Sequence, residues 1–359
     1  MENKTSLTKN TNDIECENER KPKYNKIINI KSPNKEYKLI FREIRSLKII
    51  NKKSDYLVQM ENIYLNKDTN DIIFSFFDEG IDLAKLVNNS VYDYKSEEGL
   101  IPWIMFQILK ALETLNTLNI IHRDINLSHI LISNIGRIKI IGFSRSITDI
   151  ESKFIDDKVV GKLPYLAPEI LLLQNYNSKI DIWAAGVIML ELYTKEQFFL
   201  KYKDDNINEE YPKRFFRQLK YLANTLKVPF NFNENNYNIN DLINWLDNEA
   251  KFNEEEFDNF CKSIAGLKEE GKDLLKNLLT FNPKERITAK EALKMPYFQA
   301  FQKFHKDEFK KKKFKGGNED MTNFLKNLEK EYQKVNKNYS QEKKKEIFQK
   351  ELFNILEKN

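Results

Sequence analysis

The chain has 359 residues, of which 41% are hydrophobic and 12% aromatic, and its net charge is +5. This length exceeds one ordinary domain and suits a two-lobed domain with tails. No stretch approaches the roughly 18 consecutive apolar residues of a membrane span. The polar N-terminus lacks the apolar core of a secretory signal, so we expect no membrane association.

Cysteine usage and charge distribution give two further expectations. Cys16 and Cys261 are the only cysteines, and they form no disulfide or metal-binding pattern, which favours a cytoplasmic and/or nuclear location. Residues 301–359 hold 16 lysines against 10 acidic residues. A positive tail therefore follows a nearly neutral body.

The first part of the chain predicts a small, mostly β lobe. Residues 1–20 are polar and are expected to be disordered. Strand-like patterns occupy residues 26–31, 56–60 and 71–77, and helical apolar spacing occupies residues 41–50. We therefore expect an N-terminal lobe over residues 21–79.

Helical patterns dominate after Gly80. Residues 101–115 carry a long apolar stripe with Pro102 near the first turn, and helical spacing returns at residues 273–279 and 288–293. The Asn- and Glu-rich stretch 201–260 predicts an insertion of short helices and loops. This order indicates a mostly α lobe over residues 80–300.

The lysine-rich tail, residues 301–359, contains amphipathic patterns at residues 321–332 and 342–356. Its lysines are interleaved with acids and it has no arginine, so at most weak electrostatic binding of nucleic acid is expected. Its apolar positions favour helices that pack on the protein's own surface or on a partner helix.

Five motifs follow one another in a fixed order. They are IHRDINLSHIL at residues 121–131, KIIGFS at 139–144, GKLPYLAPE at 161–169, DIWAAG at 181–186 and FNPKERITAKEAL at 281–293. In order and spacing they resemble the catalytic loop, metal-binding turn, A-P-E segment and large-lobe helices of eukaryotic protein kinases. The resemblance implies an α+β, bilobal fold of the serine/threonine kinase type.

The FREI sequence at residues 41–44, the interval of 27 residues from Gly142 to Glu169, and the insertion after Gly186 are similar to the CMGC or cell-division-cycle-like branch. The resemblance also implies structural roles for His122, Arg123, Phe143, Asp181 and a buried Glu169–Arg286 pair.

The nucleotide-binding parts are reduced. No glycine precedes Gly80, so the glycine-rich loop is missing from this sequence and the N-lobe is expected to be truncated. Lys31 and Glu43 resemble the phosphate-binding lysine and its helical partner, although Lys31 could equally be an ordinary surface lysine. Phe76, as gatekeeper, with Asp78 and Glu79 of the hinge, would contact a nucleotide.

Both positions that normally bind magnesium are changed. His129 replaces the asparagine of the catalytic loop and Gly142 replaces the aspartate of the metal-binding turn. Mg²⁺ prefers oxygen ligands, whereas imidazole suits zinc or copper, and Asp124 with His129 alone would make a poor site. We expect no dedicated metal site and lost or weak Mg²⁺ binding.

Asp124 occupies the position of the catalytic base. Its usual lysine neighbour is Asn126 here, and Lys162 replaces the threonine of the P+1 loop. We hypothesise that Lys162 restores the positive charge by reaching Asp124.

Two functions remain open. The first is a catalytically deficient pseudokinase that acts through protein partners as a scaffold or allosteric regulator. Under this interpretation, ATP binding stays open. The alternative is a divergent active serine/threonine kinase that transfers the γ-phosphate of ATP with Asp124 as base.

Overall fold

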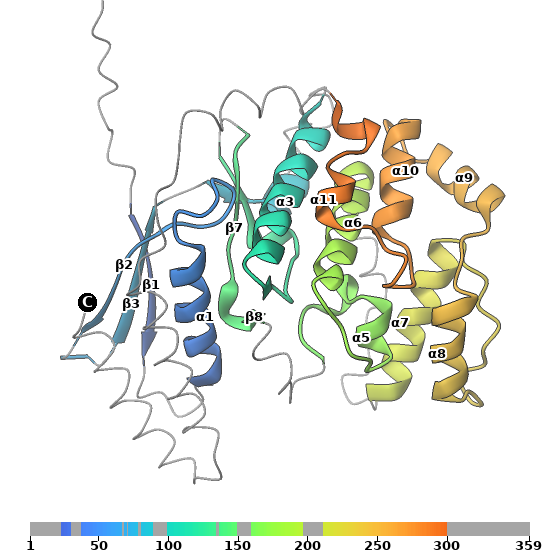
Figure 1. Cartoon of the computed structure of the whole chain (residues 1–359), viewed down its shortest axis with the longest axis horizontal. Coiled ribbons are helices and arrows are strands. Elements are labelled where there is room, and N and C mark those ends of the chain that lie inside the picture. The colour runs from blue at the N-terminus through green and yellow to red at the C-terminus, as the bar shows by residue number, and fades with distance from the viewer. Residues whose placement is uncertain are drawn as a thin grey trace, which may run out of the picture.

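The computed structural model describes most of the chain between residues 23 and 299 (Figure 1). The described ranges are 23–29, 37–66, 68–69, 71–77, 80–88, 99–133, 136–148, 159–196 and 211–299. The segments 1–20 and 301–359, with the patterns expected in them, lie outside these ranges. So do Lys31, Asp78 and Glu79.

An antiparallel sheet of three strands lies at one end of the molecule, in the order β1–β3–β2 (Figure 1). The strands are β1 (Lys23–Asn29), β2 (Met60–Asn66) and β3 (Asp71–Phe77). Successive side chains of a strand point to opposite faces. Ile72, Phe74 and Phe76 are accordingly all buried on the inner face, where Lys26 of β1 stands in register with Phe74.

Helix α1 (Tyr37–Ile50) lies beside the inner face of this sheet (Figure 1). Ile40, Phe41, Ile44 and Leu47 recur at helical spacing and are all buried. The helix therefore presents one apolar stripe to the core, and the polar residues between these positions are buried as well.

The strand expected at residues 56–60 is wrong, because the strand begins at Met60 and continues to Asn66. The residues before Met60 instead form hydrogen bonds with β7 (Ile138–Ile140). The Val58 N–H donates to the Ile140 carbonyl at 3.0 Å, and the Ile140 N–H donates to the Tyr56 carbonyl at 2.9 Å. Leu57 is fully buried there. The apolar sequence pattern around Leu57 therefore reflects burial in the core and not continuous pairing with a neighbouring strand.

Two long helices, α3 (Leu100–Thr117) and α6 (Lys179–Thr194), pack together in the centre of the second lobe (Figure 1). In α6, 14 of 16 residues are buried, which is the pattern of a helix enclosed on all sides. A Cβ at Gly186 would lie 2.8 Å from a methyl of Leu279, so glycine permits close packing on α10 (Glu269–Leu278).

Further helices complete this lobe. They are α2 (Leu83–Val87), α5 (Pro168–Leu171), α7 (Tyr211–Thr225), α8 (Ile239–Asn248), α9 (Glu254–Lys262) and α11 (Ala289–Ala292). Helices α7, α8 and α9 occupy the far end of the molecule, in the stretch where short helices and loops are expected (Figure 1). A β-containing lobe followed by a helical lobe confirms the expected α+β, bilobal architecture.

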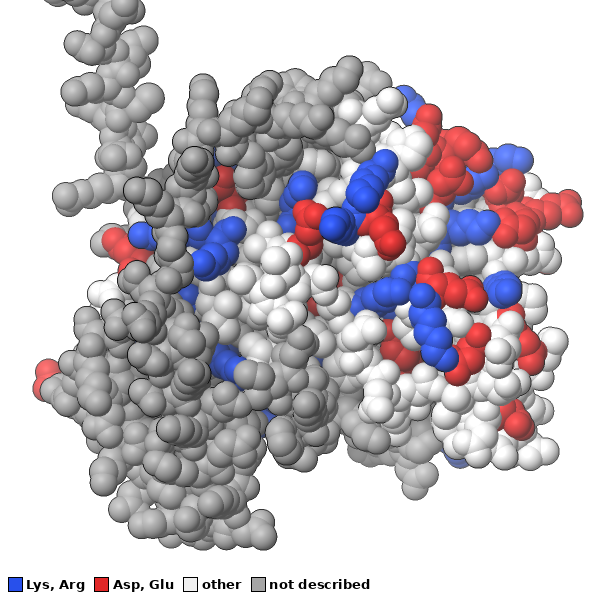
Figure 2. Space-filling view, in the orientation of Figure 1, with Lys and Arg blue, Asp and Glu red and all other residues white. Residues whose placement is uncertain are grey.

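The described surface carries charges of both signs. In Figure 2, Lys and Arg side chains alternate with Asp and Glu over α9 and α10. Lys272 pairs with Asp258 at 2.8 Å, and the Lys276 ammonium lies 2.5 Å from Glu254. Such exposed pairs contribute little stability, but they leave no region of a single charge on this part of the surface. Among the described helices, none is long and apolar enough to cross a membrane.

Candidate functional site

Hydrogen bonds to α6 hold the catalytic-loop motif in place. The Asp181 carboxylate accepts the N–H of His122 at 2.8 Å and the N–H of Arg123 at 3.0 Å. Burial raises the pKa of Asp181 to about 7, while these two backbone donors act in the opposite direction. Arg123 has a positive φ of 66°, which is uncommon for a residue other than glycine, and the bonds to Asp181 hold this bend.

Arg123 fixes the loop to the segments around it. Its Nε donates to the Arg145 carbonyl at 2.6 Å and one of its terminal nitrogens donates to the Tyr176 hydroxyl at 3.0 Å. The activation-segment residues that follow position 148 and precede position 159 lie outside the described ranges. The described contacts of Arg123 are therefore structural ones.

His122 is a buried, neutral imidazole. Its Nε2 lies 2.9 Å from the Ile141 carbonyl, an atom that can only accept, so Nε2 carries the proton. Its Nδ1 accepts the Asp124 N–H at 3.3 Å. Burial, and secondarily the charge of His129, lower the pKa of His122 to about 3. The ring packs edge-on against Phe143, with centroids 4.7 Å apart.

Asp124 is almost enclosed by polar neighbours, its side chain being 9% exposed. Asn126 Nδ2 donates to its Oδ1 at 3.1 Å. His129 Nδ1 and Arg145 Nε each lie 3.6 Å from Oδ2. The carboxylate at the base position thus already has a cation, an imidazole and an amide around it.

Lys162 does not contact Asp124, in contrast to the hypothesis drawn from the sequence. Its ammonium donates to Asn126 Oδ1 at 3.0 Å and to the Ser128 hydroxyl at 3.3 Å. Asn126 is N-cap of the short helix η2 (Leu127–His129), and its amide stands between the lysine and the carboxylate. Lys162 therefore orients Asn126, which in turn bonds Asp124.

His129 and Gly142 occupy one shared space. A Cβ added at Gly142 would lie 2.8 Å from His129 Cγ and Cδ2. His129 Nδ1 is 2.8 Å from the Asp124 carbonyl oxygen, which fixes the ring in this place. Any side chain at position 142 consequently requires His129 to move.

Glu43 on α1 pairs with Lys26, five residues before the lysine expected from the sequence. The Lys26 ammonium lies 2.6 and 2.7 Å from the two carboxylate oxygens. Both residues face inward, Glu43 being buried and the Lys26 side chain 36% exposed. Phe76 is buried on the same face of the sheet, stacked beside Phe74 at 6.3 Å.

Phe143 and the residues after it connect the two lobes. Phe143 begins the short helix η3 (Phe143–Arg145) and is fully buried. The Ser146 hydroxyl, just after this helix, donates to the Ser46 hydroxyl of α1 at 2.7 Å. The turn that contains Gly142 is therefore packed against the helix that carries Glu43.

Glu169 and Arg286 form a buried, bidentate ion pair. Arg286 donates to the two Glu169 oxygens at 2.7 and 2.9 Å, and both side chains are at most 1% exposed. The guanidinium also donates to the carbonyls of Lys179, Thr280 and Phe281. A fully bonded pair of this kind links α5 to the segment that precedes α11.

Three contributors to the site were not anticipated. Lys26 and Ile28 are two residues apart in a strand and therefore lie on the same face, a signal that could have identified the lysine. No sequence pattern pointed to Arg145. Tyr165 in the A-P-E segment donates to Glu191 of α6 at 2.7 Å, and burial raises the pKa of Glu191 to about 7.

The described residues combine a lysine–glutamate pair, a carboxylate at the base position and a buried phenylalanine, but contain no cluster of three or more metal-ligating side chains. The positions of His129 and Gly142 offer a nitrogen and no side chain to a metal.

The fold and this arrangement define a protein kinase domain. The protein kinase domain family model matches residues 15–298, and the chain belongs to this family. It is 32% identical over 272 residues to the serine/threonine-protein kinase ppk23 of Schizosaccharomyces pombe, covering 72% of this chain and 60% of that protein. It is 28% identical to cyclin-dependent kinase 12 of Caenorhabditis elegans, covering 73% of this chain and 35% of that protein.

The chain thus spans 60% or less of the length of these curated relatives. Its relatives include serine/threonine kinases of the mitogen-activated and cyclin-dependent types, which places it near the CMGC branch. Among solved structures, the yeast RNA Pol II CTD kinase CTDK-1 complex has a chain with a TM-score of 0.59 and 22% identity, covering 78% of this chain and 86% of that one. This likeness shows the fold.

Proposed function

We propose that this chain is a catalytically deficient kinase domain, a pseudokinase, that acts as a scaffold or allosteric regulator in kinase signalling. The observation that supports it most directly is the contact between His129 and Gly142. Mg²⁺ requires oxygen ligands in near-octahedral geometry. Neither position supplies one, and the imidazole occupies the space that a carboxylate at position 142 would need.

The surroundings of Asp124 support the same proposal. Phosphoryl transfer depends on positioned charge that neutralises the phosphates, and magnesium normally provides most of it. Here the nearest described cation, Arg145, faces the Asp124 carboxylate at 3.6 Å. A carboxylate that is paired in this way is less accessible to a substrate hydroxyl.

Thermal unfolding with ATP or ADP tests the loss of magnesium binding. A ligand at about 100 times its dissociation constant raises the free energy of unfolding by about 2.7 kcal/mol. We expect any stabilisation by nucleotide to be the same in Mg²⁺ and in EDTA. Stabilisation that appears with Mg²⁺ and disappears with EDTA would contradict the proposal.

A pair of variants provides the matched control. His129→Asn together with Gly142→Asp returns two oxygen ligands and removes the ring that blocks one of them. We expect Mg²⁺-dependent nucleotide stabilisation in the double variant and none in Gly142→Asp alone, where His129 still fills the space.

The alternative is a divergent active serine/threonine kinase, and a specific observation favours it. The Lys26–Glu43 pair is formed, Phe143 is buried and Asp124 is retained, so these three non-metal parts of the site are in place. Under this alternative Asp124 accepts the proton of a substrate hydroxyl. Phosphotransfer that Asp124→Ala abolishes would establish it.

Protein partners are the third part of the proposal. The solved relative is described as a kinase complex, and a kinase, a substrate or a regulatory subunit is the class of partner we propose for this chain. We propose a cytoplasmic or nuclear site of action. Recovery of the tagged chain from the cytoplasmic and nuclear fractions tests the site of action. Mass spectrometry of co-purifying proteins tests the class of partner.

A further inference from the structure

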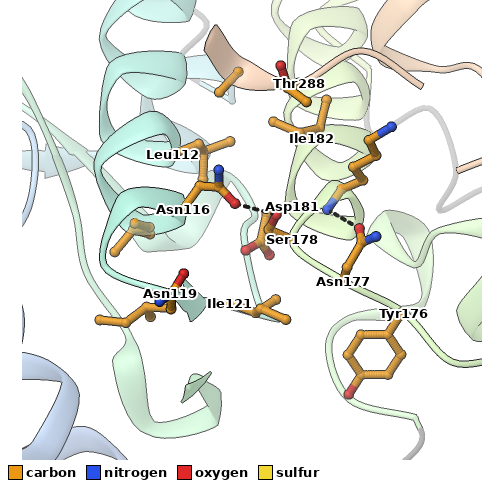
Figure 3. A pocket seen from close by; sticks show the side chains of 14 residues that line it. Leu112, Asn116, Asn119, Ile121, Tyr176, Asn177, Ser178, Asp181, Ile182 and Thr288 are labelled. Atoms are coloured by element: carbon orange, nitrogen blue, oxygen red, sulfur yellow. Dashed lines mark hydrogen bonds between the residues drawn. The ribbon is translucent and has the colours of Figure 1, made fainter. Parts of the chain in front are cut away.

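A cavity of about 300 Å³ lies between the end of α3, strand β5 (Ile120–Ile121), the start of α6 and α11 (Figure 3). Its size is at the lower end for ligand sites and suits one or two side chains better than a nucleotide. We call it the back cavity.

The rim of the back cavity is rich in hydrogen-bond donors. Asn116 Oδ1 accepts the Ser178 hydroxyl at 2.8 Å and Asn177 Oδ1 accepts the Lys179 N–H at 2.9 Å (Figure 3). With both oxygens engaged, the two amide nitrogens have no partner among the described residues. The side chain of Asn119, on the same rim, is likewise without one.

The charge of the rim is positive. Lys179 lines the cavity, and within the described part of the chain its ammonium donates one hydrogen bond, to the Lys284 carbonyl at 3.1 Å. Burial and the nearby Arg286 lower the pKa of Lys179, against weaker effects of Glu291 and Glu169. The one carboxylate in the lining, Asp181, is buried and accepts two backbone N–H groups. Glu291 lies next to the rim, where its carboxylate accepts the Thr288 hydroxyl at 2.7 Å and the Thr288 N–H at 3.0 Å. An incoming carboxylate would therefore meet the free amide donors and the Lys179 ammonium, while both neighbouring carboxylates already accept hydrogen bonds.

The wall of the back cavity is apolar. Leu112 and Leu115 of α3, Ile182 of α6 and Ala289 of α11 line it, and all four are buried. An aliphatic side chain placed here would contact these side chains and remove its own apolar surface from water. The cavity thus combines an apolar wall with a donor-rich, positive rim.

Two residues of the back cavity form hydrogen bonds with the catalytic loop. Asp181, in its lining, holds the N–H groups of His122 and Arg123. Tyr176, at its edge, accepts a hydrogen bond from the Arg123 side chain (Figure 3). A ligand that orders these two residues also orders the loop that carries Asp124.

We propose that the back cavity is a docking site for a segment of a partner protein that places an acidic side chain on the amide rim and an adjacent aliphatic side chain against the apolar wall. The proposal holds whether or not Asp124 transfers phosphate, so it can fail separately from the proposed catalytic deficiency.

Fluorescence anisotropy with the full chain tests the proposal. The probe is a labelled, terminally blocked hexapeptide of alternating Glu and Leu, and the comparison peptides carry Gln or Lys in place of Glu. We expect binding of the Glu peptide with a dissociation constant on the order of 100 μM, and at least about fivefold weaker binding of the Gln peptide. No binding of the Glu peptide up to about 1 mM, or equal binding of all three, overturns the proposal.

Isosteric variants locate the binding site. Asn116→Asp with Asn177→Asp keeps the two accepting oxygens and removes the free donors. We therefore expect the affinity for the Glu peptide to fall at least tenfold and the affinity for the Lys peptide to rise. Each factor of ten corresponds to roughly 1.4 kcal/mol. Asn235→Asp with Asn236→Asp, two exposed changes of the same total charge on a distant loop, serves as control. Equal affinities for the rim variant and the control overturn the site.

Hydrogen exchange tests the connection to the catalytic loop. Binding of the Glu peptide should slow exchange of the amides of His122 and Arg123, which Asp181 holds. A bound peptide that leaves both exchange rates unchanged would overturn the inferred connection.

Discussion

At the scale of single residues, the loss of one magnesium ligand position is tied to the loss of the other. The His129 ring lies where a side chain at position 142 would begin, and it is held by its bond to the Asp124 carbonyl. Restoring a carboxylate at position 142 alone therefore produces a clash instead of a metal site. The two substitutions form one steric unit.

Stability measurements test this unit. Gly142→Asp should cost about 1–3 kcal/mol from overpacking, and His129→Asn in the same chain should recover most of it, giving a coupling energy of about 1 kcal/mol or more. Gly266→Asp is the control, because Gly266 has a similar φ of 84° against 86° but nothing within 4 Å of its Cβ. Additive effects of the two changes would refute the shared space.

His122 gives a prediction for pH dependence. Its folded-state pKa of about 3 is below its usual value of 6.5, so the unfolded chain binds more protons between these values. Its contribution to stability is present above pH 6.5 and is lost as the pH falls, at up to about 1.4 kcal/mol per pH unit. Glu191 and Asp181, whose pKa values are raised to about 7 from 4.5 and 3.8, act in the opposite direction as the pH falls below 7.

Comparison with His122→Gln separates the two effects. We expect the difference in urea midpoint between the native chain and His122→Gln to shrink as the pH falls from 7 to 5, because the variant has no group to protonate. A difference that stays constant over this range would show that His122 is not held neutral in the fold.

At the scale of elements, α6 organises the helical lobe. Asp181 at its start holds the catalytic loop, Trp183 lies 5.1 Å from the Arg286 guanidinium, and Glu191 near its end accepts Tyr165. One buried helix therefore supports the loop, the buried ion pair and the A-P-E segment together.

The Glu169–Arg286 pair should be costly to break. Glu169→Ala leaves a fully buried guanidinium without its counter-charge, and we expect a loss of about 3–5 kcal/mol in chemical unfolding. Glu254→Ala is the control, because its pair with Lys276 is exposed and should contribute less than about 1 kcal/mol. Similar losses for both variants would contradict the assignment of burial as the cause.

Sequence patterns predicted the long elements better than the short ones. The apolar stripe of residues 101–115 lies within α3, and the run 71–77 coincides with β3. The error at residues 56–60 arose because Leu57 is buried by a single bridge to β7, and burial without a ladder gives the same apolar pattern. Local periodicity cannot distinguish these two environments.

Within the site, motif spacing brought Glu169 and Arg286 to attention although 117 residues separate them. It could not find Arg145, whose proximity to Asp124 depends on the path of η3. Nor could it assign Lys162, since the choice between Asn126 and Asp124 is a matter of side-chain reach. Such contacts depend on tertiary geometry that a motif does not encode.

At the scale of the whole molecule, the lobes are joined by contacts between side chains, and no cluster of three or more metal-ligating side chains occurs in the described part of the chain. The Lys26–Glu43 pair joins the sheet to α1, and the Ser46–Ser146 hydrogen bond joins α1 to the turn after Gly142. These contacts need no magnesium. The kinase-like shape therefore does not depend on magnesium, which is compatible with the catalytic deficiency that we propose.

The most direct test is a phosphotransfer assay with radiolabelled ATP and Mg²⁺ on the native chain and on Asp124→Ala, with protein substrates and the chain itself as acceptors. We predict that both proteins give the same background incorporation, because neither position 129 nor position 142 supplies a magnesium ligand. Incorporation by the native chain that Asp124→Ala abolishes would contradict catalytic deficiency.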